Sequence, residues 1–151
     1  GTVTRALGYG YKVGVVQFNK GLWECGERNR LEDDPHLSVA IMATGFTWDT
    51  QNREADTAAC LEVWQEAQKM LADPEMYLVV LDELTYMLKF GYLDIATVKQ
   101  ALLDRPQEQT VIITGRNAHR ELVAMADTVT DMQEVRHAFN NGLQARRGID
   151  F

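Results

Sequence analysis

The chain has 151 residues, a length typical of one domain, and 46% of them are apolar, as in ordinary globular proteins. Charged residues make up 25% of the chain and give it a net charge of −7. An acidic chain of this kind is poorly suited to neutralise the phosphates of a nucleic acid, so no nucleic-acid partner is expected.

The two cysteines, Cys25 and Cys60, form no CxxC pair and no cluster with the three histidines. This spacing argues against a zinc site or a disulfide framework, and two scattered thiols fit a reducing cytoplasm. No apolar run reaches the roughly 18 residues that span a bilayer, and the front of the sequence does not resemble a secretion signal. We therefore expect a single cytoplasmic domain over residues 1–151, without a membrane partner.

The first residues predict the end of a helix. Val3, Ala6 and Leu7 fall on one helical face, and Gly8 or Gly10 is suited to cap it. So short a helix is not stable alone, and we expect further residues of the parent protein to precede it.

Four mostly apolar runs predict strands, and Asp127–Val135 is a weaker fifth candidate. The four are continuous rather than alternating in polarity, as in a parallel sheet that is covered on both faces. They are Tyr11–Phe18, Leu37–Met42, Met76–Glu83 and Thr110–Gly115.

Helical patterns separate these runs. The longest covers residues 54–74, where Pro74 forbids continuation, and shorter ones cover Ile95–Leu103 and His119–Ala126. The alternation of strands and helices predicts an α/β fold with right-handed crossovers. The expected buried stripe of the long helix consists of Thr57, Cys60, Leu61, Trp64 and Leu71.

Ligands of such folds bind beyond the carboxyl ends of the strands, where four stretches can hold a ligand or do chemistry. They are QFNKG (17–21), MATGFTW (42–48), LDELTY (81–86) and TGRNAH (114–119).

The stretch VVLDE resembles a Walker B segment, in which an acid at a strand end holds Mg²⁺ on a nucleotide. Asp82 and Glu83 are the acids concerned. The alternative is a buried strand whose acids cap the next helix.

Arg116 follows the next predicted strand in the sequence TGR. Gly115 permits a tight turn there, and an arginine can bind a phosphate with two parallel hydrogen bonds. The alternative is an arginine that only faces solvent.

The stretch GFTW places two large aromatic residues in a polar segment. In an extended loop Phe46 and Trp48 point to the same side and can form a wall against a large flat ligand. Thr50 or Asn52 is suited to cap the following helix and so to fix this wall. The alternative is that both aromatics pack into the core or a subunit interface.

A phosphate loop of the form GxxxxGK[ST] is absent from this chain. The segment Gly8–Lys12 (GYGYK) resembles one only superficially, because it precedes a predicted strand, whereas a phosphate loop follows one.

Many motifs of this chain occur in the order found in one family. They are VGVVQF, KG, GERN, MATGFTW, TQNREADTAA, VVLDELTYM, RP, QTVIITGR, HR, ADTV, HAF and a terminal GID followed by an aromatic residue. Over nearly its whole length the chain resembles the ATP:cob(I)alamin adenosyltransferases of the CobA/BtuR type. This resemblance implies a RecA-like P-loop NTPase fold, with a mostly parallel sheet flanked by helices, and a homodimer. It also implies transfer of the 5′-deoxyadenosyl group of ATP to the Co(I) centre of a corrinoid such as cob(I)alamin, with release of triphosphate, in adenosylcobalamin biosynthesis or salvage.

The resemblance implies a role for the loop aromatics. Phe46 and Trp48 would lie beneath the corrinoid ring and act in catalysis by displacing the lower axial ligand, while Met42, Thr44 and Gly45 would line the same cleft. Removing that ligand and excluding water makes Co(II) easier to reduce to the nucleophilic Co(I). A flavoprotein is the candidate reductant.

On the nucleotide side, Glu83 matches the family's metal-binding acid, with Asp82 beside it, and Mg²⁺ or Mn²⁺ is the expected ion. Arg116 matches a phosphate-binding arginine, and Arg5 on the first helix is expected to face the nucleotide. No general base is expected, because a metal-centred nucleophile has no proton to lose.

The chain departs from the family in one respect. A GNGKGKT-type loop is expected just before Gly1, so the first strand and the phosphate loop are absent from this sequence and are expected in the parent polypeptide. Two alternatives remain: another P-loop ATPase or kinase, which has no need of GFTW, and a non-catalytic corrinoid-binding or nucleotide-binding module, which fits the missing loop.

Overall fold

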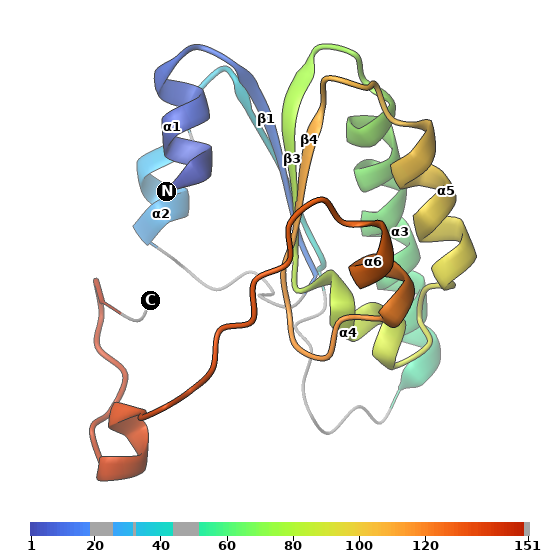
Figure 1. Ribbon diagram of the computed structural model, residues 1–151. Helices are drawn as coiled ribbons and strands as arrows, with labels where there is room; N and C mark the ends of the chain where they lie inside the picture. The colour runs from blue at the N-terminus through green and yellow to red at the C-terminus, as the bar shows by residue number, and fades with distance from the viewer. Residues whose placement is uncertain (19–25, 32, 44–51, 150–151) are drawn as a thin grey trace.

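The computed structural model describes residues 1–18, 26–31, 33–43 and 52–149 (Figure 1). In this part of the chain four parallel strands form one sheet in the order β2-β1-β3-β4. The strand order and the helices on both faces confirm the predicted α/β class. The strands are β1 (Lys12–Gln17), β2 (Leu37–Ile41), β3 (Met76–Asp82) and β4 (Thr110–Ile113), which confirms the four main strand predictions.

Helices cover both faces of the sheet. In Figure 1, α1 (Thr2–Gly8) and α2 (Gly26–Leu31) lie on one side, and α3 (Arg53–Ala72) and α5 (Ile95–Asp104) lie on the other. Two short helices stand near the carboxyl ends of β3 and β4, and a 3₁₀ turn lies in the C-terminal segment. These elements are α4 (Leu84–Lys89), α6 (Arg120–Met125) and η1 (Ala138–Asn141).

The central strand β1 divides its side chains between two apolar clusters. Val13 packs with Ala6 and Leu7 of α1, whereas Val16 belongs to the larger cluster beneath α3 and α5. Continuous apolar sequence in β1 is therefore explained by burial on both faces. Gly14 lets α3 approach closely, because a Cβ atom there would lie 2.7 Å from the sulfur of Met70.

Helix α1 ends as the sequence predicts. Gly10 has a φ of 77°, and its N–H donates to the Leu7 carbonyl at 2.8 Å, while the Tyr11 N–H donates to the Ala6 carbonyl at 3.2 Å. This pair of bonds is the Schellman arrangement, in which a glycine in the left-handed region follows the helix.

Helix α3 confirms most of the expected buried stripe and corrects one position. Cys60, Trp64 and Leu71 are buried, and Thr57 is half-buried, but Leu61 is 46% exposed. The contact face is centred on Cys60, Val63, Ala67 and Met70, and Leu61 lies about 100° around the helix from Cys60.

The strand predicted at Asp127–Val135 was wrong. This segment is irregular, and Val129, Met132 and Val135 are 57%, 91% and 93% exposed. A strand is stable only beside a hydrogen-bonded neighbour, and no strand among the described residues pairs with this one. The β-branched residues and alternating polarity of this segment are therefore not sufficient to form a strand.

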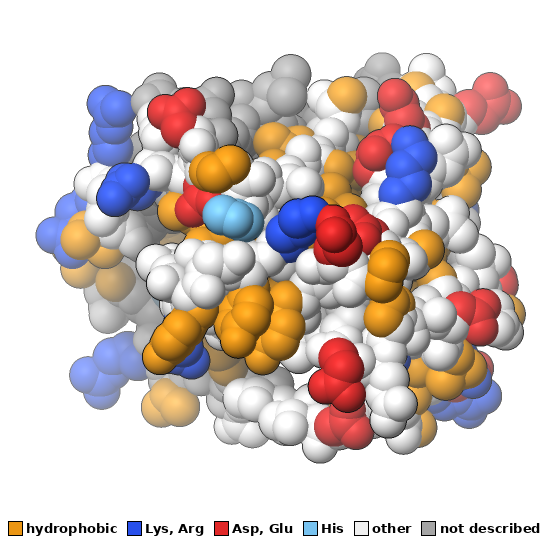
Figure 2. Space-filling view, turned by 90° about the horizontal axis from the view of Figure 1, so that it is seen from above, with side chains coloured by type: hydrophobic (Ala, Val, Ile, Leu, Met, Phe, Trp, Pro, Cys, Tyr) orange, Lys and Arg blue, Asp and Glu red, His pale blue; other side chains and the backbone are white. Residues whose placement is uncertain are grey.

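The amino-terminal edge of the sheet is the surface seen from above in Figure 2, where a group of exposed hydrophobic side chains gathers. Tyr9, Tyr11 and Tyr77 lie there, and the rings of Tyr11 and Tyr77 stack with centroids 4.1 Å apart. Lys12 forms an ion pair with Glu75 at the same edge. No described helix is long and apolar enough to cross a membrane.

Candidate active site

The predicted site residues gather at the opposite edge, where the parallel strands end. Gln17, the last residue of β1, is in register with Ile41 of β2 and with Asp82 of β3. Thr114 directly follows β4. The end of β3, with its acids, thus lies between the end of β1 and the end of β4, as the topology of a parallel sheet requires.

Asp82 is held by the neighbouring strand. The Thr114 hydroxyl donates a 2.8 Å hydrogen bond to Oδ1 of Asp82, and the same hydroxyl accepts a 2.9 Å hydrogen bond from the Glu83 N–H. One threonine therefore contacts both acids of the LDE motif, and it fixes an acceptor oxygen of Asp82 in place.

Glu83 adopts an unusual backbone conformation, with φ 62° and ψ 22°. The left-handed region costs a residue with a side chain about 1–2 kcal/mol, and such outliers are often retained at functional sites. Glu83 occupies the N-cap position of α4, but its side chain makes no capping hydrogen bond. The interpretation of Glu83 as a helix cap is therefore not supported.

Arg116 lies in the loop after β4, beside the β3–α4 turn. The Thr85 hydroxyl of α4 donates a 2.9 Å hydrogen bond to the Arg116 carbonyl. Arg116 is exposed, and Gly115 before it has a φ of 131°. The structure thus brings the backbone of Arg116 and the two acids into adjacent loops.

The acids are suited to Mg²⁺ or Mn²⁺ only with help from a bound phosphate. Among the described residues no group of three or more His, Cys, Asp or Glu side chains could hold a metal ion. Mg²⁺ in nucleotide sites commonly takes one or two carboxylates together with phosphate oxygens and water. Asp82 and Glu83, at a strand end beside a fixed hydroxyl, fit that kind of site and do not fit an all-protein cage.

The corrinoid-side predictions fall mostly on residues 44–51, which lie outside the described residues. Thr44, Gly45, Phe46 and Trp48 belong to this segment. Met42 is described: it is fully buried, and its N–H donates to the Gln17 carbonyl at 3.0 Å. Its side chain therefore belongs to the core of this structure.

The start of α3, directly after that segment, is firmly anchored. Oδ1 of Asn52 accepts a 3.1 Å hydrogen bond from the Ala55 N–H, which confirms Asn52 as the helix cap. The Arg53 guanidinium donates to the Phe90 carbonyl at 2.8 Å and lies 5.3 Å from the ring centroid of Tyr92. The first turn of α3 is therefore fixed to the segment that follows α4.

Arg5 is exposed on α1. The residue before α1, Gly1, lies toward the end of the molecule where the strands terminate, because α1 runs opposite to β1 (Figure 1). No described contact joins Arg5 to the acids, so its role toward a nucleotide stays a prediction.

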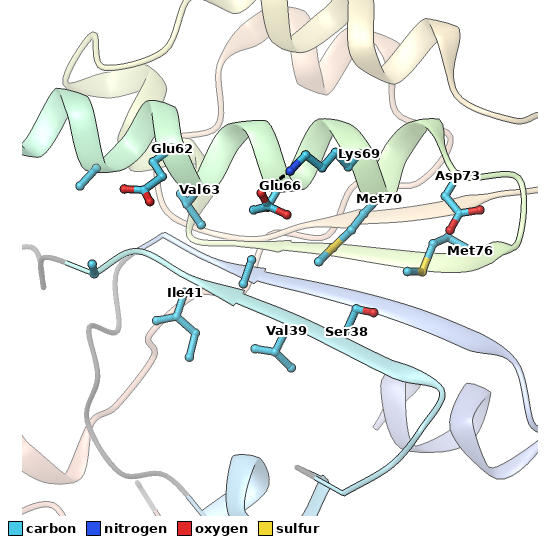
Figure 3. A pocket seen from close by; sticks show the side chains of 13 residues that line it. Ser38, Val39, Ile41, Glu62, Val63, Glu66, Lys69, Met70, Asp73 and Met76 are labelled. Carbon is cyan, nitrogen blue, oxygen red and sulfur yellow. Dashed lines mark hydrogen bonds and ion pairs between the residues drawn. The ribbon is translucent and has the colours of Figure 1, made fainter.

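A cavity of about 710 Å³ opens between α3 and the edge strand β2 (Figure 3). Glu62, Glu66 and Asp73 give its α3 wall an acidic character, and Lys69 forms a 2.6 Å ion pair with Glu66. Of the predicted site residues that the structure describes (Arg5, Met42, Asp82, Glu83 and Arg116), none lines this cavity.

Sequence reasoning missed the residues that support the site. Thr114 and Thr85 lay inside motifs that were chosen for their charged neighbours. Gln17 lay inside the candidate stretch QFNKG, and Arg53 lay inside the motif TQNREADTAA, but neither was singled out. A polar residue directly after a predicted strand was a usable signal for Thr114. The contact of Thr85 with the loop after β4 depends on α4, a helix that was not predicted.

Comparison with known proteins agrees with these observations. Residues 1–151 match the family described as "ATP:corrinoid adenosyltransferase BtuR/CobO/CobP". The chain is 60% identical to the corrinoid adenosyltransferase of Escherichia coli (strain K12) and 58% identical to the corrinoid adenosyltransferase CobA of Salmonella typhimurium, and these matches cover 100% of this chain and 76% of each relative. It is 47% identical to the corrinoid adenosyltransferase of Pseudomonas aeruginosa, again over 100% of this chain and 75% of the relative. The chain therefore belongs to the ATP:corrinoid adenosyltransferase family.

Proposed function

We propose that this protein transfers the 5′-deoxyadenosyl group of ATP to the Co(I) centre of a corrinoid, in adenosylcobalamin biosynthesis or salvage. The electron pair of Co(I) attacks C5′, a cobalt–carbon bond forms, and the C5′–oxygen bond breaks. Triphosphate leaves with the electrons of that bond, so no external base is needed. Family membership supports this reaction, and one structural observation carries it: both acids of the LDE motif share the Thr114 hydroxyl at the carboxyl edge of the sheet.

On the nucleotide side, Asp82 and Glu83 would hold Mg²⁺ or Mn²⁺ beside the phosphates of ATP. The ion supplies positive charge that stabilises the departing triphosphate. Arg116 would bind the phosphates from the loop after β4, and Arg5 would approach them from α1. The adjacency of the two loops supports this assignment, because it brings the backbones of Arg116 and of the two acids to one edge of the sheet.

On the corrinoid side, Phe46 and Trp48 would form the surface beneath the ring, with Met42, Thr44 and Gly45 nearby. The segment that carries them connects β2 to α3, so it starts and ends at the same edge of the sheet as the acids. The Asn52 cap and the Arg53 contacts anchor the first turn of α3 directly after this segment, which supports a binding site at this edge of the sheet.

Several finer features belong to the same proposal. Residues 1–151 would form one adenosyltransferase domain of the RecA-like P-loop class, the working protein would be a cytoplasmic homodimer, and a flavoprotein would supply the electrons. The parallel sheet, with helices on both faces and an acid at the end of β3, supports the fold assignment.

The products formed from ATP separate this proposal from its alternatives. Protein of full natural length would be incubated with ATP, Mg²⁺ and chemically reduced cob(I)alamin, and the phosphate products separated by ion-exchange chromatography. Triphosphate that appears only when the corrinoid is present supports the adenosyltransferase. ADP with inorganic phosphate would indicate an ATPase, ADP with a phosphorylated acceptor would indicate a kinase, and unchanged ATP would indicate a binding module.

A further inference from the structure

We infer that two threonine hydroxyls, those of Thr114 and Thr85, are positioning residues that hold the acids of the β3–α4 turn and Arg116 in one fixed arrangement. This inference rests on the proposed function, because it concerns the same metal and phosphate site. Neither hydroxyl needs to touch the substrate, since both act through residues that do.

Thr114 ties the end of β4 to the acids. Its hydroxyl has one proton, which it donates to Oδ1 of Asp82 at 2.8 Å, and it accepts the Glu83 N–H at 2.9 Å. In the first bond Oδ1 of Asp82 is the acceptor, and the bond fixes the position of this carboxylate oxygen. The second supports the peptide of Glu83, whose φ of 62° would otherwise be unfavourable.

Thr85 makes the reverse connection. It belongs to α4, is 3% exposed, and donates its hydroxyl proton to the Arg116 carbonyl at 2.9 Å. The hydroxyl fits there only because residue 115 has no side chain: a Cβ atom at Gly115 would lie 2.0 Å from Oγ1 of Thr85. The loop that contains Arg116 therefore packs directly against α4.

The two bonds act where the backbone ladder stops. The last ladder bond between the two strands runs from the Thr114 N–H to the Leu81 carbonyl at 3.1 Å. Beyond this bond, the Thr114 hydroxyl at the end of β4 contacts Asp82 and Glu83, and the Thr85 hydroxyl of α4 contacts the Arg116 carbonyl. Together they set the position of the Arg116 backbone relative to the acids before ATP binds, which contributes to the preorganisation that an electrostatic site needs.

Thr114→Val tests the first connection, because valine keeps the shape of threonine and removes the hydroxyl. Residues that hydrogen-bond to metal-binding carboxylates typically change metal affinity or activity by about 10–100-fold when they are altered. We expect Thr114→Val to weaken Mn²⁺ binding in the presence of ATP by at least about tenfold. Thr114→Ser, which keeps the hydroxyl, should restore most of this loss.

The matched control is Thr110→Val. Thr110 begins the same strand, is exposed, and stands at the opposite edge of the sheet. It carries the same chemical change without a contact to the acids, so Mn²⁺ binding and turnover should be unchanged.

Thr85→Val tests the second connection. It should leave Mn²⁺ binding near the wild-type value and raise the ATP concentration needed for half-maximal rate by about tenfold, because Arg116 contacts phosphate and not the metal. Thr85→Ser should again restore the wild-type behaviour. A general loss of stability does not change the ATP requirement while leaving Mn²⁺ binding unchanged.

The measurements are Mn²⁺ titrations of the full-length protein with ATP, followed by electron paramagnetic resonance, together with steady-state kinetics and melting curves. Loss in Thr114→Val with recovery in Thr114→Ser and no change in Thr110→Val supports the inference. Wild-type Mn²⁺ binding in Thr114→Val, beside weakened binding in Glu83→Gln, would overturn the inference and leave the proposed function standing. Wild-type Mn²⁺ binding in Glu83→Gln would refute the metal assignment and the inference together. If Thr110→Val and Thr114→Val lose Mn²⁺ binding equally, and the loss follows a fall in melting temperature, the inference would also be overturned.

Discussion

Gly115 and Thr85 fit together only because residue 115 lacks a Cβ atom, which would lie 2.0 Å from the Thr85 hydroxyl oxygen. The φ of 131° at Gly115 is a second reason for glycine at this position. The contact joins the loop of Arg116 to helix α4, so the placement of a predicted phosphate-binding residue depends on a side chain from another element.

Gly115→Ala should therefore destabilise the protein by roughly 2 kcal/mol or more, since it adds both a steric clash and backbone strain. Urea denaturation followed by circular dichroism measures this change. Gly8→Ala is the control, because Gly8 ends helix α1 and a Cβ atom there meets nothing within 4 Å. Alanine at residue 8 should be neutral or stabilising by up to about 1 kcal/mol. Equal denaturation midpoints for the two variants would show that the contact does not constrain the loop.

Glu83→Gln should abolish most of the turnover while the fold is retained. Glutamine keeps the size of the side chain and removes the charge next to the triphosphate, and metal stabilisation of that charge is worth several kcal/mol, or a factor of roughly 100 or more in rate. Glu62→Gln, on the exposed side of α3, is the matched control. Unchanged turnover of Glu83→Gln at saturating Mg²⁺ and ATP would remove Glu83 from the site.

Replacing Phe46 and Trp48 together with alanine separates a corrinoid surface from a core position. If both are core residues, the double variant should lose on the order of 3–5 kcal/mol of stability for each aromatic. If they lie beneath the corrinoid, the melting temperature should change much less, and ATP binding should persist. Alkylation of Co(I) from a strong chemical reductant should continue with reduced efficiency.

The decisive contrast is a pair of assays of that double variant, one starting from Co(I) and one from Co(II) with a weak biological reductant. Activity from Co(II) should collapse, along with the optical signature of four-coordinate Co(II), because the axial ligand is no longer displaced. Equal losses in both assays, tracking a large drop in melting temperature, would assign the aromatics to the core.

Cys60 should be unreactive in the folded protein. It is fully buried in the cluster beneath α3, and burial raises the pKa of its thiol from 9.0 to about 12. In the Cys25→Ser variant Cys60 is the single thiol of residues 1–151, and iodoacetamide at pH 8 should label it only after urea unfolds the chain. Rapid labelling without urea would contradict this burial.

The raised pKa of Cys60 also predicts how the stability of the fold depends on pH. Between pH 9 and pH 12 the unfolded chain releases the Cys60 proton while the folded protein keeps it. The contribution of this thiol to stability is therefore complete below pH 9 and is lost as the pH rises toward 12. Cys60→Ala should lessen the fall in stability over that range, as measured by urea denaturation at each pH.

The sequence predicted the buried strands and the long helix because burial leaves a periodic pattern in single segments. The run at Met76–Glu83 and the stripe around Cys60 and Trp64 are examples, and the observed elements agree with them. Asp127–Val135 has a similar local pattern without a neighbouring strand to pair with, and pairing is not visible within one segment.

The candidate site was predictable only in part for the same reason. Asp82, Glu83 and Arg116 carry charge at strand ends, so their residue types identify them. The roles of Thr114 and Thr85 arise from contacts between residues about 30 positions apart, and both are common residues in loops and helices. The place of Thr114 directly after a predicted strand was a usable signal, whereas nothing in the local sequence distinguishes Thr85 from other helical threonines.

The most direct test of the central claim follows the 5′ carbon of ATP. Full-length protein would receive ATP labelled with ¹³C at C5′, together with Mg²⁺ and cob(I)alamin, and the corrinoid would be isolated for nuclear magnetic resonance and mass spectrometry. We predict one labelled carbon bonded to cobalt for each triphosphate released, and a loss of both products together in Glu83→Gln. Label that stays in ADP, AMP or unreacted ATP, with an unalkylated corrinoid, would contradict the assignment of this protein as a corrinoid adenosyltransferase.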